Sequence, residues 1–476
     1  MSGENDTGFL DRTLRNLRRA WRGIAGADYD ADAASLRPDL PDDDAERLRE
    51  QMRACLESRG GEVSARARAA ALGHAFLALN ATGRARFLKV LADDFEVDPD
   101  AVDAAVQALR EAPEGESRRQ AERELRRRLL APRVHLLTQF NALPEGVKFL
   151  VDMRAELLGL VRRDPSLKPL DNDLKDLLRT WFDIGFLELR RITWDSASGA
   201  LLEKLVAYEA VHAIESWQDL KNRLDSDRRC FAFFHSRMPD EPLIFVEVAL
   251  TNGMAGNIQD LLDEEAPVQN PTSADTAIFY SISTAQKGLA GIGFGSFLIK
   301  RVVDSLAGEL KGLSTFATLS PIPGFMEWLQ AGLDEGRPGL LTAADRRALK
   351  SATDGSRGSK GALKKLLSEA SWHGDEGLRQ ALREPLMRLC SRYLIEERRP
   401  GGSTALDAVA HFHLNNGAGM ERLNWLADTS AKGIEQSAGM MMNYLYRLDK
   451  IEDNHEAYTS ESAIAASSAV RNHLKN

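Results

Sequence analysis

Two hydrophobic patterns divide this chain. Over residues 1–185, apolar residues recur every three or four positions, the spacing of helices that each bury one face. The clearest examples are residues 10–21, 65–79, 84–95 and 170–178. This part of the chain is therefore predicted to be an all-α helical bundle. Its arginine-rich helix near residues 117–130 is interpreted as a solvated face rather than a partner surface.

From residue 186 onward, short runs of apolar, β-branched and aromatic residues alternate with helical stretches. The predicted strands are residues 187–194, 230–235 and 242–250, and the predicted helices are residues 201–210 and 216–224. Such alternation is typical of an α/β domain. The predicted organisation is therefore a helical bundle over residues 1–185 and an α/β domain over residues 186–476.

The C-terminal part adds three further expectations. Residues 341–393 are mostly helical and polar, with a flexible break at residues 355–361, which predicts a helical insertion at about residues 340–395. Residues 408–414 have the character of a strand. Residues 433–448 predict a methionine-rich helix, whose methionines are expected to pack in the core.

A glycine-rich loop lies at the centre of the α/β part. A strand-like run at residues 277–282 precedes it, a one-faced helix at residues 296–310 follows it, and a second strand-like run covers residues 314–319. The glycines are Gly288, Gly291, Gly293 and Gly295. A loop at a helix N-terminus has free backbone N–H groups and the positive end of the helix dipole, which favour a phosphate.

The glycine spacing restricts which phosphate ligand is expected. Gly291, Gly293 and Gly295 alternate with single residues, unlike the G-x-G-x-x-G of dinucleotide-binding folds, and no Lys-Ser or Lys-Thr pair of a nucleoside-triphosphate loop follows. The pattern resembles the pyrophosphate loop of the GNAT acyltransferase fold, which holds coenzyme A. The alternative is a glycine-rich turn without a ligand.

Composition narrows the function classes. The chain has 476 residues, 43% hydrophobic content and a net charge of −9, so a large core is expected and nucleic acid is not an expected partner. No apolar run approaches the ~20 residues of a membrane span. The cysteines Cys55, Cys230 and Cys390 have no metal-ligand spacing and are expected to be buried thiols in a reducing compartment. A cytoplasmic location is predicted.

Two sites outside the loop could carry chemistry. Ser320 ends a predicted strand just before Pro321 and Pro323, which would hold its hydroxyl rigidly, although a serine there is often only a turn residue. His411 and His413 would share one face of a strand. No third ligand stands at recognisable spacing, so we expect no metal and at most one catalytic histidine.

Several blocks of sequence together resemble the malonyl-CoA decarboxylase family. They are AIFYSIS, GLAGIGFGSFLIKRVV, TLSPIPGF, FHLNNGA, NWLADTS and NYLYRL, spread in order over residues 180–460. The resemblance implies an N-terminal helical bundle, a C-terminal GNAT-like catalytic domain, and a homo-oligomer, either a dimer or a tetramer. Because the helices of residues 1–185 contain no cluster of candidate catalytic groups, we expect them to mediate self-association. It also implies conversion of malonyl-CoA to acetyl-CoA and carbon dioxide without metal or biotin.

The same resemblance assigns roles to residues of this chain. Ser320 and His413 would be the catalytic pair, with Tyr446 beside them. The coenzyme A phosphates would lie against Ala290, Gly291, Ile292, Gly293, Phe294, Gly295 and Ser296. In the reaction, a histidine can protonate the enolate that remains when carbon dioxide leaves, and a serine hydroxyl can orient the substrate carboxylate.

Three other functions are compatible with these residues. A GNAT-type acyltransferase would use the same loop to pass an acyl group to an amine. An acyl-CoA hydrolase would use Ser320 as nucleophile and His413 as base, although Ser320 is not in a G-x-S-x-G elbow. A protein that senses coenzyme A without turnover is the third. The products formed from malonyl-CoA distinguish all of these.

Overall fold

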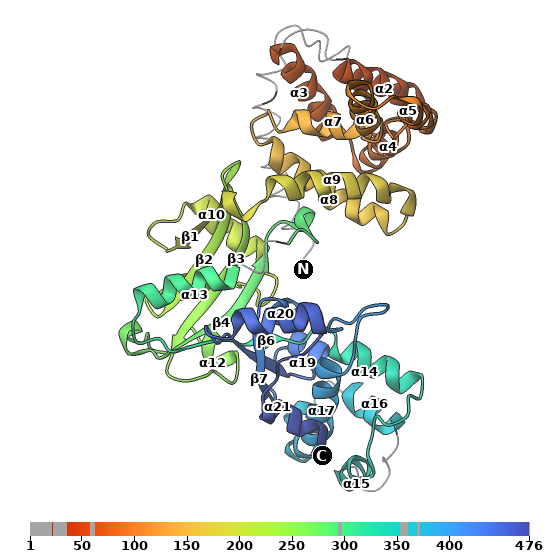
Figure 1. Ribbon diagram of the computed structural model, residues 1–476. Coiled ribbons are helices and arrows are strands. Elements are labelled where there is room, and N and C mark those ends of the chain that lie inside the picture. Colours follow the sequence, from red (N-terminus) through yellow and green to blue (C-terminus); the bar gives the residue numbers. More distant parts are fainter. Residues whose placement is uncertain are drawn as a thin grey trace. The chain divides into compact units, whose positions relative to one another are not determined.

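The computed structural model describes residues 21, 36–57, 62–293, 298–352, 360–368 and 372–475. The chain divides into two compact units (Figure 1). The first unit comprises Met1–Glu188, Phe234–Leu243 and Ala285–Gly293, and the second comprises Leu189–Phe233, Ile244–Thr284 and Phe294–Asn476. The first unit is helical and the second has mixed α/β structure, which confirms the predicted fold class.

The first unit is built from helices whose apolar faces meet in an aromatic core. They are α2 (Asp42–Leu56), α3 (Glu62–Ala78), α4 (Ala81–Asp93), α5 (Pro99–Glu111), α6 (Glu116–Arg128), α7 (Pro132–Phe140), α8 (Gly146–Val161) and α9 (Lys168–Trp181). Asn80 and Asp98 cap α4 and α5 by accepting hydrogen bonds from backbone N–H groups of the first turn. Phe149 of α8 packs against Trp21 and Phe140, each with 4.9 Å between ring centroids.

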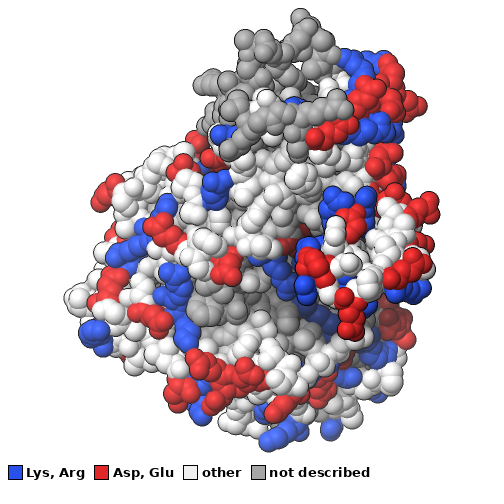
Figure 2. All heavy atoms as spheres, turned by 45° about the horizontal axis from the view of Figure 1, so that its top comes forward, with Lys and Arg blue, Asp and Glu red and all other residues white. Residues whose placement is uncertain are grey.

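Helix α6 is a solvated helix, as its sequence predicted. None of its side chains is buried. Its arginines pair with glutamates of the same helix, for example Arg123 with Glu116 and Arg128 with Glu124. Figure 2 shows the same mixture of signs more widely, because basic and acidic side chains are interspersed over the face it presents.

The second unit contains most of the sheet and the helices that cover it. The strands are β1 (Leu187–Ile192), β2 (Arg228–His235), β3 (Met238–Thr251), β4 (Thr276–Thr284), β5 (Thr315–Thr318), β6 (Ser320–Pro321), β7 (Gly419–Asn424) and β8 (Met441–Leu445). The helices are α10 (Gly199–Tyr208), α11 (Trp217–Arg223), α12 (Gln259–Leu262), α13 (Leu298–Glu309), α14 (Phe325–Asp334), α15 (Ala343–Ala352), α16 (Lys360–Ser368), α17 (Glu376–Ile395), α18 (Ala408–Asn415), α19 (Ala431–Ser437), α20 (Ile451–Glu461) and α21 (Ser468–Asn472).

The strand order is β1-β2-β3-β4-β5-β8-β6, and β7 pairs with β8. β4 and β5 are parallel and are connected through α13, so the predicted βαβ unit is confirmed. Leu298, Val302 and Leu306 of α13 are fully buried, and the helix lies across the sheet in Figure 1. Arg229 on β2 reaches the end of α13 and pairs with Glu309 at 2.7 Å.

The predicted methionine-rich helix over residues 433–448 is wrong. Helix α19 ends at Ser437, and Ala438 and Gly439 both adopt positive φ (50° and 76°), which terminates the helix. Met441 and Met442 then enter β8 and are fully buried. The sequence has strong helix formers here, but burial between strands on both sides decides the structure. Most of the predicted flexible break at residues 355–361 lies outside the described residues.

The second unit contains a buried group of charged residues from helix α11 and strand β3. Arg223 of α11 donates to Asp219 at 2.6 Å and to Glu247 of β3 at 3.2 Å. Burial raises the pKa of Glu247 to about 8, and the nearby carboxylate of Glu209 adds to the effect.

The three cysteines are all buried, as predicted. Cys55 lies in the helical unit, and Cys230 and Cys390 lie in the α/β unit. Burial raises the pKa of Cys55 to about 11 and the pKa of the other two thiols well above the usual value. Within the described ranges, no helix is long and apolar enough to cross a membrane.

Candidate active site

Ser320 was predicted to end a strand, but it lies in a separate short strand that follows. Strand β5 stops at Thr318, and Ser320 opens the two-residue strand β6, which pairs with β8 opposite Met442. The following Pro321 has no N–H to donate, so the sheet does not continue far. The Ser320 side chain is buried, with 5% of its surface exposed.

The predicted strand at residues 408–414 is wrong, because His413 lies in helix α18. Asp407 caps the helix by accepting a hydrogen bond from the backbone N–H of Ala410 at 2.8 Å. A short apolar run does not by itself distinguish a buried strand from a buried helix. In the helix, His411 and His413 have different partners, and His411 binds the hydroxyl of Tyr458 at 2.8 Å.

Ser320, His413 and Tyr446 form one hydrogen-bonded chain. Ser320 Oγ lies 3.0 Å from His413 Nε2, and His413 Nδ1 lies 2.8 Å from the Tyr446 hydroxyl. Ser320 Oγ also donates to Thr318 Oγ1 at 2.8 Å, and that oxygen accepts from the backbone N–H of Tyr444 at 3.1 Å. Since the Ser320 proton points to Thr318, the consistent tautomer has the proton on Nε2, and Nδ1 accepts from Tyr446.

The surroundings of His413 keep it uncharged. Its side chain is 2% exposed and its ring stacks on Tyr444, with 4.5 Å between ring centroids. Burial lowers the pKa of His413 to about 3 and raises the pKa of Tyr446 well above 10. The free site is therefore a neutral chain of one imidazole and several hydroxyls near pH 7.

Sequence reasoning did not single out Thr318 and Tyr444, although Thr318 contacts Ser320 and Tyr444 contacts His413. Both lie within blocks that carried the family resemblance, TLSPIPGF and NYLYRL. Thr318 stands two residues before Ser320, a spacing at which neighbouring side chains of an extended segment share a side. That spacing was the available signal for Thr318. The stacking of Tyr444 depends on the course of a strand and a helix distant in sequence, for which there was no local signal.

The glycine loop belongs to the other unit. Ala290, Gly291, Ile292 and Gly293 are described, whereas Phe294, Gly295 and Ser296 lie outside the described residues. The described part packs within the first unit, where Gly288 meets α8. Gly291 adopts a positive φ of 74°, which suits glycine.

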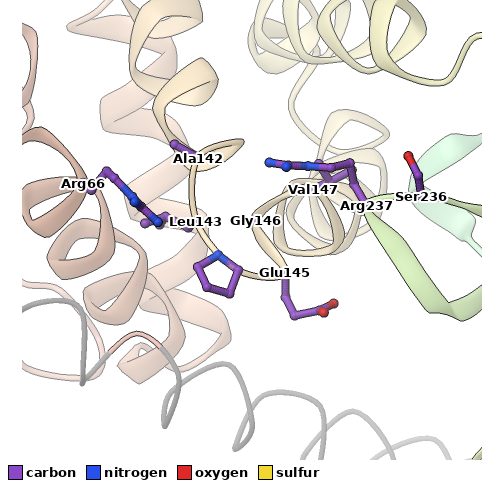
Figure 3. A pocket seen from close by; sticks show the side chains of 9 residues that line it. Arg66, Ala142, Leu143, Glu145, Gly146, Val147, Ser236 and Arg237 are labelled. Carbon is purple, nitrogen blue, oxygen red and sulfur yellow. The ribbon is translucent and has the colours of Figure 1, made fainter. Parts of the chain in front are cut away.

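The first unit also contains a polar pocket of about 350 Å³ beside the start of α8. Arg66 and Arg237 extend toward the turn at residues 142–147 from opposite sides (Figure 3). Ser320, His413 and Tyr446 are not among its lining residues. Among the residues that the structure describes, no group of three or more His, Cys, Asp or Glu side chains is placed to hold a metal ion.

Comparison with known proteins identifies relatives over most of the chain. The family described as malonyl-CoA decarboxylase C-terminal domain matches residues 185–476, and the corresponding N-terminal domain family matches residues 95–182. The mitochondrial malonyl-CoA decarboxylase of the goose Anser anser anser is 41% identical over 403 residues, covering 81% of this chain and 79% of the relative. The mouse protein of that name is 40% identical, covering 82% and 81%.

Solved structures similar to this chain belong to the same family. The crystal structure of malonyl-CoA decarboxylase from Rhodopseudomonas palustris has 41% sequence identity and a TM-score of 0.82, covering 90% of this chain and 99% of that chain. The Agrobacterium vitis structure has 40% identity and a TM-score of 0.80, with the same coverage. The chain therefore belongs to the malonyl-CoA decarboxylase family.

Proposed function

We propose that this protein converts malonyl-CoA to acetyl-CoA and carbon dioxide, and that Ser320 and His413 carry the reaction. The main support is the 3.0 Å hydrogen bond between the Ser320 hydroxyl and His413 Nε2, in a chain of this family. The relatives compared above are named malonyl-CoA decarboxylases, which gives the substrate and the reaction type.

The reaction consumes one proton. Loss of carbon dioxide from a β-carboxy thioester leaves an enolate, and a proton must then be added to carbon. His413 is neutral in the free site, but the malonyl carboxylate brings a negative charge that favours uptake of a proton on the imidazole. When the C–C bond breaks, the charge passes to the enolate, and the imidazolium donates its proton to carbon. Because burial disfavours the imidazolium, it is a strong acid at that moment.

Ser320 and Tyr446 hold the reacting groups in place. The Ser320 hydroxyl donates to Thr318 in the free site. When substrate binds, it turns its proton to the malonyl carboxylate and orients the C–C bond for cleavage. Tyr446 fixes the ring of His413 through Nδ1. Preorganised donors of this kind stabilise charge as it develops in the transition state.

The remaining parts of the proposal concern the coenzyme, the assembly and the location. The loop at residues 290–296 binds the coenzyme A pyrophosphate, and the reaction needs neither metal nor biotin. The active protein is a homo-oligomer, either a dimer or a tetramer, without nucleic acid or membrane as partner. We propose a cytoplasmic location, whereas the goose and mouse relatives are named as mitochondrial.

A product assay tests the proposed function. The protein is incubated with malonyl-CoA, and acetyl-CoA, free coenzyme A and carbon dioxide are quantified. Acetyl-CoA and carbon dioxide in equal amounts are expected. Free coenzyme A without carbon dioxide, or no turnover, would overturn the proposal.

The hydrolase alternative is favoured by one observation, because a serine 3.0 Å from a histidine is also the arrangement of a nucleophile and its base. A hydrolase forms an acyl-serine on Ser320, and mass spectrometry of rapidly quenched enzyme detects it. We expect no adduct, because in the tautomer described above His413 Nε2 carries a proton and has no lone pair with which to deprotonate Ser320.

A further inference from the structure

The described part of the glycine loop lies directly on helix α8. A Cβ atom at Gly288 would stand 1.8 Å from the backbone carbonyl oxygen of Val151, so only glycine fits at this contact. Gln286 holds the start of the loop by donating to the carbonyl oxygen of Pro242 at 2.9 Å. The helical unit therefore supplies the surface on which this loop is folded.

Arg154 lies one turn after Val151 in α8 and holds the loop by hydrogen bonds to its backbone. Its side chain is 2% exposed, and one terminal nitrogen donates to the carbonyl oxygens of Gly288 and Ala290 at 2.6 and 3.0 Å. Its Nε donates to Asp171 of α9 at 2.9 Å, and Asp171 also accepts from Lys168 at 2.7 Å. Two loop carbonyls are thus drawn toward the helices by a guanidinium that is itself held in place.

Lys175 lies one turn after Asp171 and reaches the exposed side of the same loop. A Cβ atom at Gly291 would stand 3.2 Å from Lys175 Nζ. Among the described residues, Lys175 has no ion pair or hydrogen bond, and the backbone N–H of Gly291 has no acceptor. The charge of Asp171 is already shared by Arg154 and Lys168. A cation and a free N–H therefore lie next to each other beside Gly291.

We propose that Lys175 binds the pyrophosphate of coenzyme A at Gly291, and that Arg154 positions the loop for this contact. The inference rests on the proposed function, because it takes coenzyme A as the ligand. The helical region, which is expected to mediate self-association, would then also bind substrate through α8 and α9. An ammonium beside free backbone N–H groups is a suitable chemistry for a phosphate oxygen.

The first test compares Lys175→Ala and Lys175→Arg with the unaltered protein. Calorimetry with coenzyme A and with 3′-dephospho-coenzyme A should show affinity for both reduced by roughly 10- to 100-fold in Lys175→Ala, the range for a lost charge-assisted hydrogen bond. Lys175→Arg keeps the charge and should recover part of the affinity. Loss confined to intact coenzyme A would assign Lys175 to the 3′-phosphate and overturn the pyrophosphate contact, as would unchanged affinity for both ligands.

Malonyl-pantetheine, which carries no phosphate, separates binding from chemistry. Lys175→Ala should raise KM for malonyl-CoA with little change in kcat, and it should leave kcat/KM for malonyl-pantetheine unchanged. An equal loss on both substrates would overturn the proposal. Failure of the proposed function is recognised separately, because the unaltered protein would then not turn over malonyl-CoA although its affinity for coenzyme A could still be measured.

Arg154 is tested against a matched arginine. Arg133 is equally buried in the same unit, where it binds Asp173 at 2.6 Å and the carbonyl oxygen of Ala92 at 2.9 Å, and no hydrogen bond or ion pair links it to the loop. Arg154→Lys should raise KM for malonyl-CoA but not for malonyl-pantetheine, whereas Arg133→Lys should lower thermal stability without that difference. If the two variants behave alike toward both substrates, Arg154 is only structural.

Discussion

The Tyr446→Phe variant tests whether the Tyr446 hydroxyl orients the imidazole of His413 for the reaction. The substitution removes the hydroxyl that lies 2.8 Å from His413 Nδ1 and leaves a buried ring nitrogen without a partner. An unpaired buried acceptor costs about 1–3 kcal/mol. If the same energy is lost in the transition state, kcat should fall by roughly 10- to 100-fold, because each 1.4 kcal/mol corresponds to about a factor of ten.

Tyr444 offers a control on strand β8, which ends one residue before Tyr446. It is equally buried and stacks on His413, but its hydroxyl has no hydrogen-bond partner among the described residues. Tyr444→Phe therefore removes an unsatisfied hydroxyl and should leave stability unchanged or slightly higher. Steady-state kinetics and urea unfolding are measured for both variants. Equal losses of kcat in the two variants, or full activity in Tyr446→Phe, would refute the orienting role of Tyr446.

Three further predictions concern the loop, the ion group and the catalytic pair. Gly288→Ala should raise KM for malonyl-CoA, because its Cβ collides with Val151 of α8. Gly159 lies at an open position of α8 itself, so Gly159→Ala should stabilise the protein by about 0.5–1 kcal/mol. Steady-state kinetics and thermal unfolding are measured for both variants. The pKa of Glu247 is raised in the folded state to about 8, so the native protein binds more protons than the unfolded chain between about pH 4.5 and 8, and stability should fall as pH rises through this window. Glu247→Gln should flatten that fall in urea titrations, and an unchanged slope would contradict the assignment. His413→Ala should lower kcat by about 10²–10⁴-fold. Adding Ser320→Ala should cost less than the product of the separate effects, since both residues act on one transition state, and strictly multiplicative losses would argue against a joint role.

Local pattern predicted much of the fold because most elements here are long or strongly patterned. The β4–α13–β5 unit follows from an apolar strand, a glycine loop and a one-faced helix, and each of these lies close to its predicted place. Helix α18 was missed because it is only eight residues long, a length that a buried strand can also have. Asp407 immediately before it is a good N-cap residue, and that signal would have favoured the helix.

The candidate site could be predicted only in part, because its residues are far apart in the sequence. Ser320 and His413 are 93 residues apart, and no local pattern specifies that their side chains meet at 3.0 Å. Family resemblance paired them, while the neutral state of His413 follows from burial, which the sequence does not report. The sequence does place Arg154 on the apolar face of α8, and a cation there requires a buried partner. Nothing in the sequence indicates that the carbonyl oxygens of the glycine loop are that partner.

The three buried cysteines allow local unfolding to be followed by the rate at which their thiols are alkylated. Thiolates, not thiols, react with alkylating reagents, and each of these thiols is both enclosed and held protonated. Labelling of the native protein should therefore proceed only through opening events. Because Cys55 stands in the helical unit and Cys230 and Cys390 in the α/β unit, the labelling rate at each site measures how often its own surroundings open. Peptide mapping after timed alkylation would then show, without any introduced probe, whether the two units open together or separately.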